Sequence, residues 1–277
     1  MVTARFGLSV RRACRLVGLW RASQQYQPHP RSDEAPLRHR LRELAEQRHR
    51  FGCPRLHVLL RREGFLVNHK RTERLYREEG LALRRKRHRK RAAGVRVTFP
   101  APTRPNERWA MDFLHDRLAD GRRFRVLTMV DAYSRESPAI EADTSLTGAK
   151  VVQILDRVAQ TQGLPQGITI DNGPEFSGSA LDAWAYRRGI QLHFIEPGKP
   201  TQNAYVESFN GRFRDECLNE HWFPTLEEAR GLIEAWRQDY NTVRPHSSLG
   251  DLTPTEFAER ERSLHNTNPQ ELYLQLA

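Results

Sequence analysis

Apolar residues follow a helical period through the first third of the chain. From Leu37 to Leu60, leucines recur three or four positions apart in two runs separated by a glycine turn, which predicts two amphipathic helices. Asn68 is a suitable N-cap for a third helix, and Gly80 is a suitable terminator. We therefore expect an all-α helix-turn-helix domain over residues 37–83, with a generic three-helix bundle as the alternative.

The beginning of the chain carries a weaker helical signal. Ser9 can cap a first short helix, and Gly18 separates it from a second. We expect residues 1–30 to form a short helical segment that could itself be a helix-turn-helix. Three prolines within residues 27–36 predict a linker to the helices that follow.

From residue 107 the pattern changes to short strands that alternate with helices. Strands are expected at residues 109–118, 124–134, 137–143, 167–170 and 191–195. Helices are expected at residues 147–160, 179–188, 202–213, 225–240 and 253–262. This order predicts the α/β class: a ribonuclease-H-like mixed five-stranded sheet with helices on both faces, forming a core over residues 107–262. Residues 263–277 are expected to be a tail.

The distribution of charge separates the same two regions. Lys and Arg outnumber Asp and Glu by 26 to 8 in residues 1–99, whereas residues 100–277 hold 19 basic and 26 acidic residues. A cationic first third is typical of a protein that binds a polyanion such as DNA. The densest run opens a basic linker over residues 84–106, and its candidate DNA contacts are Arg84, Arg85, Lys86, Arg87, Arg89, Lys90 and Arg91. A merely solvated linker is the alternative.

Several classes of protein are disfavoured by what the sequence lacks. The three cysteines, Cys14, Cys53 and Cys217, are far apart and form no CxxC pair, which argues against a disulfide scaffold and a zinc finger. No run of 18 apolar residues and no signal-peptide pattern is present. We therefore expect a cytoplasmic, nucleoid-associated protein.

Two aspartates occupy positions that suggest a site at one edge of the sheet. Asp112 lies in the middle of the first expected strand, between Met111 and Phe113, where a charge is costly unless it is paired or binds metal. Asp171 directly follows the strand at residues 167–170, and open α/β sheets bind ligands beyond the carboxyl ends of their strands. An Asp-Asn-Gly sequence taken alone is more often an ordinary turn.

A glutamate on a later helix completes the set of candidate acids. On a helical wheel Asn203, Glu207, Asn210 and Arg214 share one polar stripe, beside an apolar stripe suited to packing on the sheet. Arg214 lies about two turns after Glu207 and could contact a DNA phosphate. An exposed surface glutamate is the alternative for Glu207 considered alone.

Four long segments carry a resemblance to a known family. They are RWAMDFLHDRLADGRRFRVLTMVDAYSRE, TIDNGPEF, GKPTQNAYVESFNGRFRDECLNEHWF and YNTVRPHSSLGDLTPTEFAE, and GCPRLHVLLRREG adds to them. With these segments the chain resembles bacterial insertion-sequence transposases of the DDE type, the OrfB product of insertion-sequence family three, whose core is similar to retroviral integrases. Thirty-five residues separate Asp171 from Glu207, in keeping with that resemblance.

The resemblance implies roles for particular residues and partners. Asp112, Asp171 and Glu207 match the family's catalytic and metal-binding triad. This match implies that the site binds two divalent ions, either Mg²⁺ or Mn²⁺. The positions matching the family's DNA-contacting loop and helix are Lys199, Gln202, Asn203 and Arg214. The implied function is metal-dependent cleavage of element ends and transfer of a 3′-hydroxyl into target DNA. The implied partners are double-stranded DNA of the terminal repeats and the target, and further copies of the chain.

Other functions remain open at this point. A ribonuclease-H-like nuclease without transfer activity has the same sheet and acids. A non-catalytic DNA-binding regulator is also possible, as is a chain that needs the upstream OrfA product or a fusion with it, because no sustained heptad repeat is present. His246, in the segment RPHSSLG, has no role that the sequence explains.

Overall fold

The computed structural model describes residues 6–26, 32–83, 100–173, 175–176, 178–196 and 200–266. Its helices are α2 (Val10–Leu16), α3 (Arg21–Gln25), α4 (Glu34–Gln47), α5 (Cys53–Arg62), α6 (His69–Glu78), α7 (Gly148–Gln162), α8 (Ser179–Arg188), α9 (Ala204–Phe213), α10 (Leu226–Thr242) and α11 (Pro254–Asn266). Its strands are β1 (Arg108–Arg117), β2 (Arg123–Asp131), β3 (Ile140–Asp143), β4 (Gly167–Ile170) and β5 (Gln191–Phe194). Short 3₁₀ turns span η1 (Pro200–Asn203) and η3 (Ser247–Leu249), and a π-helical turn spans η2 (Arg214–Leu218). No helix within these ranges is long and apolar enough to cross a membrane.

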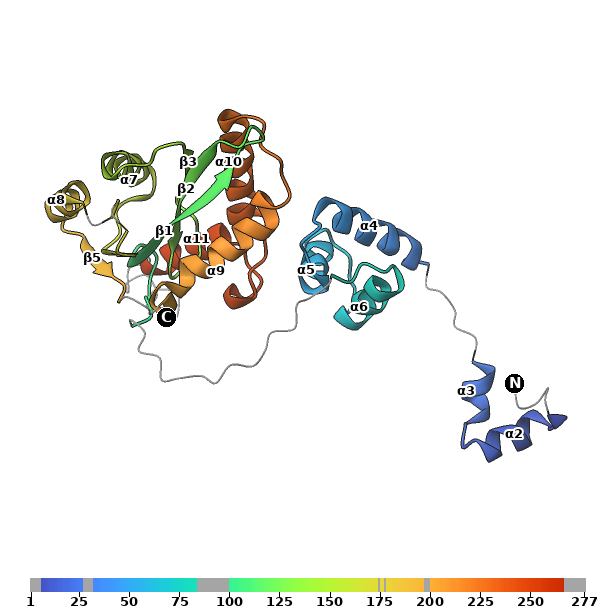
Figure 1. The fold of residues 1–277 in the computed structure, drawn as a ribbon. Coiled ribbons are helices and arrows are strands. Elements are labelled where there is room, and N and C mark those ends of the chain that lie inside the picture. The colour runs from blue at the N-terminus through green and yellow to red at the C-terminus, as the bar shows by residue number, and fades with distance from the viewer. Residues whose placement is uncertain are drawn as a thin grey trace, which may run out of the picture.

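The five strands form one mixed sheet with the order β3-β2-β1-β4-β5. Strands β1, β2 and β3 are antiparallel neighbours, whereas β4 and β5 run parallel to β1. Gly121, with a φ of +86°, makes the turn between β1 and β2. The sheet confirms the expected ribonuclease-H-like fold and places β1 at its centre (Figure 1).

Helices cover both faces of the sheet, as expected. Helices α7 and α8 pack on one face, where Trp109 and Met111 of β1 join a core with Trp184. Helices α9 and α10 pack on the other face, where Ala110 meets Phe209 and Phe213. The faces of β1 therefore alternate, and Asp112 belongs to the face covered by α9.

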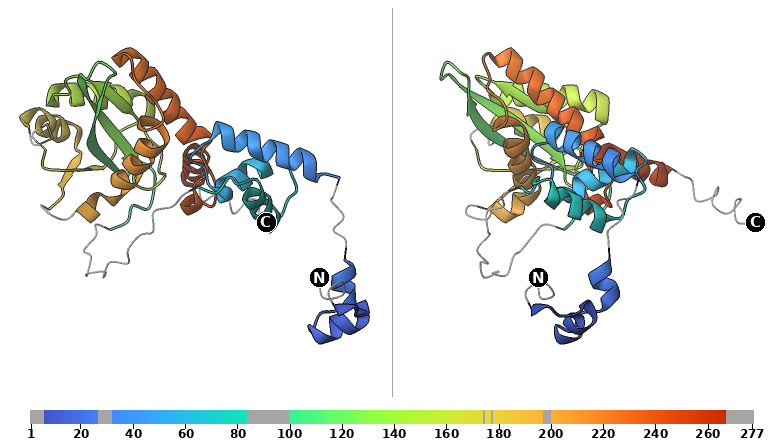
Figure 2. Two further views of the ribbon diagram at one scale, coloured as in Figure 1. Left: turned by 45° about the vertical axis from the view of Figure 1, so that its right-hand side comes forward. Right: turned by 90° about the vertical axis from the view of Figure 1, so that its right-hand side faces the viewer.

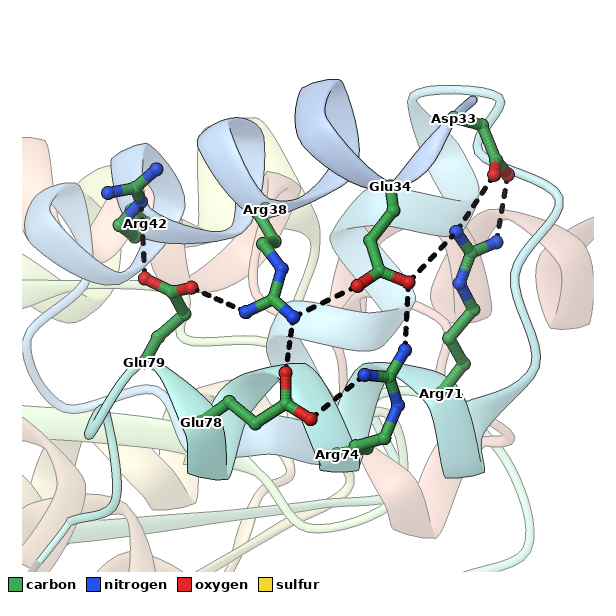
Figure 3. A network of polar contacts seen from close by, with 8 residues as sticks. All are labelled: Asp33, Glu34, Arg38, Arg42, Arg71, Arg74, Glu78 and Glu79. Atoms are coloured by element: carbon green, nitrogen blue, oxygen red, sulfur yellow. Dashed lines mark hydrogen bonds and ion pairs between the residues drawn. The ribbon is translucent and has the colours of Figure 1, made fainter. Parts of the chain in front are cut away.

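Helices α4, α5 and α6 enclose a small core of their own, built mainly from leucines. A network of ion pairs also joins α4 to α6 (Figure 3). Its centre is Glu34, which accepts hydrogen bonds from Arg38 at 2.9 Å and from Arg74 at 2.8 Å. Arg38 also pairs with Glu78 and Glu79, both from the end of α6. Many arginines of this module are thus engaged by carboxylates of the same module.

The module of α4–α6 lies against the C-terminal helices of the core (Figure 2). Four arginines of the module make ion pairs across this contact, which we call the seam: Arg48 with Asp239, Arg50 with Glu220, Arg55 with Glu216, and Arg62 with Glu256. The Arg48 pair is bidentate, with both N–O distances at 2.6 Å. Val243 adds an apolar contact to the core of the module.

The segment RPHSSLG forms a compact loop at this seam. The backbone carbonyl of His246 accepts from Leu249 and Asp251, and its N–H donates to Leu252. The His246 ring packs edge-on against Tyr240 at 4.9 Å, and its Nε2 lies 3.2 Å from Nη1 of Arg244. Because a guanidinium can only donate, Nε2 of His246 is the acceptor and its ring is neutral. The structure therefore gives His246 a packing role.

Several expected boundaries are wrong by a few residues. Helix α4 begins at Glu34 rather than at residue 37, inside the expected linker. Pro36 is tolerated there because the N–H groups of a first helical turn have no intrahelical acceptor. Strand β3 begins at Ile140, because Ser137 is instead bound to Asn241 of α10. The π-helical turn η2 after α9 was not anticipated.

Candidate active site

The pairing of β1 with β4 brings two aspartates to adjacent positions. Ala110 of β1 is the partner of Thr169 of β4 in a parallel register. Two residues further along, Asp112 lies within β1 and Asp171 directly follows the end of β4. Because side chains alternate along a strand, both positions continue the face of Ala110 and Thr169. This juxtaposition could be anticipated only once the register of the two strands was known.

Helix α9 lies over the same point of β1. The side-chain amide of Asn203 donates to the carbonyl of Met111 at 3.2 Å, and that of Asn210 donates to Oδ2 of Asp112 at 2.8 Å. Both asparagines are buried, at 4% and 6% exposure. Glu207 lies between them, one turn from each, and is exposed. The two amides thus fix the polar stripe of α9 over β1 and leave Glu207 facing solvent beside Asp112.

The electrostatics of Asp112 reflect both its burial and its acidic neighbours. Burial raises the pKa of Asp112, and the charges of Asp171 and Glu207 raise that pKa further. Hydrogen bonds from the Phe113 N–H, at 2.7 Å, and from Asn210 oppose the rise by stabilising the carboxylate. The other two acids of the predicted triad are therefore close enough to Asp112 to act on its carboxyl.

The loop after β4 is held by contacts that the sequence did not suggest. Oδ1 of Asp171 accepts from the Gly173 N–H at 3.0 Å. A methyl group at Gly173 would stand 2.9 Å from that same oxygen. Further along the loop, Glu175 pairs with Arg125 of β2. The Arg125 guanidinium in turn lies 4.4 Å from the ring centroid of Phe113, so the loop is tied to the central strands.

The chemistry of the donor set suits a hard divalent cation. The three acids offer only carboxylate oxygens, which Mg²⁺ and Mn²⁺ prefer. The buried Oδ1 atoms of Asn203 and Asn210, which flank Glu207, have no hydrogen-bond partner among the described residues. Among all the residues that the structure describes, no three His, Cys, Asp or Glu side chains lie close enough together to hold one metal ion. Asp171 and Glu207 thus lie near enough to Asp112 to influence its carboxyl, but the three acids do not form a metal-binding cluster among the described residues.

The residues expected to contact DNA differ in how accessible they are. Arg214 is exposed at the end of α9. Gln202 exchanges hydrogen bonds with Glu196, and the side chain of Asn203 is buried against β1. Lys199 and the basic run of residues 84–91 lie outside the described residues.

Sequence reasoning placed Asn210 in the polar stripe without giving it a task. The signal was present, because an asparagine one turn after a candidate catalytic glutamate shares its helical face. Gly173 and Arg125 carried no comparable signal, since their importance depends on contacts across strands and loops.

The sheet and its acidic edge define a class of protein: a polynucleotidyl transferase with a ribonuclease-H-like integrase core, a class that depends on divalent metal in general. Comparison with known families agrees. Two family models described as integrase core domain match residues 102–200 and 188–254, and one described as HTH-like domain matches residues 31–90.

Curated relatives identify the family. The chain is 52% identical over 262 residues to a 31.7 kDa protein of insertion element IS407 from Burkholderia multivorans. This alignment covers 95% of this chain and 95% of that protein. The chain is 50% identical to a 39.2 kDa protein of IS476 from Xanthomonas euvesicatoria, over 94% of this chain and 75% of that one. The Escherichia coli putative transposase InsK of IS150 is 26% identical over 80% of this chain and 83% of its own. The chain belongs to the IS3 family of insertion-sequence transposases and is a DNA transposase.

Solved structures include more distant neighbours. The catalytic core domain of HTLV-2 integrase in complex with magnesium aligns with a TM-score of 0.47 at 18% identity, covering 56% of this chain and 97% of that one.

Proposed function

We propose that Asp112, Asp171 and Glu207 are the catalytic and metal-binding residues of this transposase. They would hold two Mg²⁺ or Mn²⁺ ions while the chain cleaves the ends of its element and joins a 3′-hydroxyl to target DNA. The observation that carries the proposal is the contact of α9 with β1, where Asn210 binds Asp112 and the charges of Asp171 and Glu207 act on the same carboxyl.

The residues of the chain supply position and charge. Asn210 and the Phe113 N–H orient Asp112, and the Gly173 N–H orients Asp171. The exposed Glu207 can move toward both aspartates when their mutual repulsion is neutralised. A bound divalent metal supplies activation of the attacking oxygen and stabilisation of the leaving oxygen. Water would attack in end cleavage and a DNA 3′-hydroxyl in strand transfer, so a covalent protein–DNA intermediate is not required.

The proposal includes an organisation of the chain around this site. The segment of residues 1–30 and the helix-turn-helix domain of residues 37–83 would bind DNA, the linker of residues 84–106 would contact its backbone, and the core of residues 107–262 would act on it. Several copies would assemble on terminal-repeat and target DNA in the bacterial cytoplasm, at the nucleoid. The upstream OrfA product would be the protein partner. The helix-turn-helix match and the cationic first third support the DNA-binding part of this scheme.

Substitution of one acid tests the assignment. Asp171→Asn should retain binding to labelled terminal-repeat DNA and lose Mg²⁺-dependent cleavage and joining. Asp182→Asn, an exposed aspartate of α8, is the matched control and should retain both. Full strand transfer by Asp171→Asn would refute the proposal. Running each reaction with and without the OrfA product shows whether the chain acts alone or needs that partner.

A further inference from the structure

Positive charge gathers where helix α9, helix α5 and the loop after α10 approach one another. Four arginines contribute to it and are called the arginine cluster below: Arg55, Arg135, Arg212 and Arg244. They come from α5, from the loop after β2, from α9 and from the RPHSSLG loop, respectively. Segments far apart in the sequence thus supply the same kind of charge to one place.

Carboxylates neutralise only part of this charge. Glu216 accepts from Nε and Nη2 of Arg244 at 2.9 and 2.8 Å, and from Nη1 of Arg55 at 3.2 Å. Within the described chain it is the one carboxylate that hydrogen-bonds to members of the cluster. Arg135 instead donates to the carbonyl of Ala132 and lies 4.1 Å from the ring centroid of Tyr205. Two guanidinium groups therefore share one carboxylate, and the other two add positive charge beside them.

The neighbouring groups respond to this excess. Burial, and after it the charges of all four arginines, lower the pKa of His246 to about 3. Burial and the charge of Arg244 lower the pKa of Arg55 to about 10, although Glu216 opposes this. A lowered pKa in a cationic side chain means that its protonated form is disfavoured, as expected where burial and neighbouring positive charges act together. Such a positive electrostatic potential favours the binding of an anion.

The cluster is accessible from the helix that carries Glu207. Arg212 lies on α9 and is exposed, as are Glu207, Ser208 and Gly211 between the triad and the cluster. Arg135 and Arg55 are half-buried, and Arg244 is buried. Glu207 and Arg212 are therefore both exposed on the same helix, with the exposed Ser208 and Gly211 between them.

We propose that the arginine cluster binds a phosphate of the DNA backbone, on the strand that crosses α9 from the active site. Guanidinium groups bind phosphate through paired hydrogen bonds, and half-buried arginines lose less entropy on binding than mobile ones. The proposal rests on the proposed function, because it requires DNA to reach Glu207. Arg244 is buried, and its guanidinium is held by Glu216 and His246. It therefore adds positive potential, while the exposed Arg212 and the half-buried Arg135 would contact the phosphate.

The test measures the salt dependence of DNA binding by the full chain. Labelled duplex DNA is titrated with the parent, Arg212→Gln, Arg135→Gln and the double variant over a series of KCl concentrations. Each lost phosphate contact should lower the slope of log K against log salt by about 0.9 and weaken binding several-fold. Arg212→Lys should retain much of the slope, because it keeps the charge. The matched control is Arg187→Gln, an exposed arginine of α8 on the opposite face of the sheet, which should leave the slope unchanged.

Two results would overturn the inference. One is a slope in the double variant equal to that of the parent. The other is an equal fall in Arg187→Gln, which would show a general effect of net charge. Either could occur while Asp171→Asn still abolishes cleavage, in which case the arginine cluster is not a DNA site but the catalytic assignment stands. Conversely, active Asp171→Asn protein would refute the triad without altering the salt slopes.

Discussion

The side-chain amide of Asn210 donates a 2.8 Å hydrogen bond to Oδ2 of Asp112 across 98 residues of sequence. The bond fixes which oxygen of Asp112 faces α9, and it joins the helix of Glu207 to the central strand. Since the amide of Asn210 is buried, water cannot readily replace it. Asn210 is therefore a positioning residue for the acid at the centre of the site.

Replacing Asn210 tests this relationship. Asn210→Ala should reduce DNA cleavage by roughly 10- to 100-fold, the usual effect of removing a group that orients a metal ligand, which is the role proposed for Asp112. The loss should be partly recovered at high Mg²⁺ concentration, because the defect is in the position of Asp112 and not in its charge. Cleavage rates measured over a Mg²⁺ titration provide the readout. Asn219→Ala, at an exposed asparagine, is the control and should match the parent. An unchanged Mg²⁺ dependence in Asn210→Ala would contradict the assigned role.

Gly173 leaves room for the carboxylate of Asp171. In Gly173→Ala the new methyl group would meet Oδ1 of Asp171 at 2.9 Å, so that carboxylate must turn away. We expect a large loss of cleavage with little change in melting temperature, because only a side-chain end has to move. Gly211→Ala is the matched control, since a methyl group there meets nothing within 4 Å and alanine favours a helix. Equal activity in the two variants would show that the orientation of Asp171 does not matter.

Glu216 holds two arginines at the seam while its own side chain is only 8% exposed. Glu216→Gln removes the charge that compensates Arg55 and Arg244. Removal of one partner from a buried ion pair typically costs about 3–5 kcal/mol, and we expect a loss of that size in the free energy of unfolding measured with urea. Asp215→Asn changes the same charge at the exposed neighbouring residue and should cost less than about 0.5 kcal/mol. Similar costs for both variants would mean that the seam pair does not stabilise the chain.

The ion-pair network around Glu34 predicts a dependence on pH. Hydrogen bonds from Arg38 and then Arg74 lower the pKa of Glu34 below its ordinary 4.5. A carboxyl with a lowered pKa in the folded state contributes stability above its unfolded pKa, and that contribution is lost as pH falls through the folded value. Glu34→Gln should therefore weaken hydrogen-exchange protection of α4 and α6 near neutral pH, and this difference from the parent should shrink below pH 4.5.

The control for that comparison lies on the same helix. Glu46→Gln, at an exposed residue of α4, should resemble the parent at every pH. A difference between Glu34→Gln and the parent that stays constant down to the most acid conditions would contradict the electrostatic origin of the effect.

Local signals in the sequence were sufficient for most of the fold. Period-two and helical patterns predicted each strand and helix of the core, and the order of elements predicted the sheet, because these features depend on neighbouring residues. The errors occur where a distant residue decides: Asn241 of α10 binds Ser137 and delays the start of β3. Pro36 was taken as a linker residue although it is tolerated in a first helical turn.

The site was predictable in its acids and less so in what supports them. The identities of Asp112, Asp171 and Glu207 followed from their order and spacing in a resemblance to a known family, and these roles stay predictions. The Asn210–Asp112 bond, the Glu175–Arg125 pair and the seam each join residues at least 50 positions apart. No local pattern encodes such pairs, so only the packed chain reveals them.

The seam joins residues that are synthesised at different times. Arg48 and its partner Asp239 are 191 residues apart, so the N-terminal module leaves the ribosome long before its carboxylate partners exist. At roughly 5–20 residues per second this interval lasts on the order of 10–40 s. Until synthesis reaches residue 207, Arg48, Arg50, Arg55 and Arg62 all lack their seam partners, and Glu207 has not yet been made. The nascent transposase thus carries its cationic first third before the last acid of the proposed triad has been made.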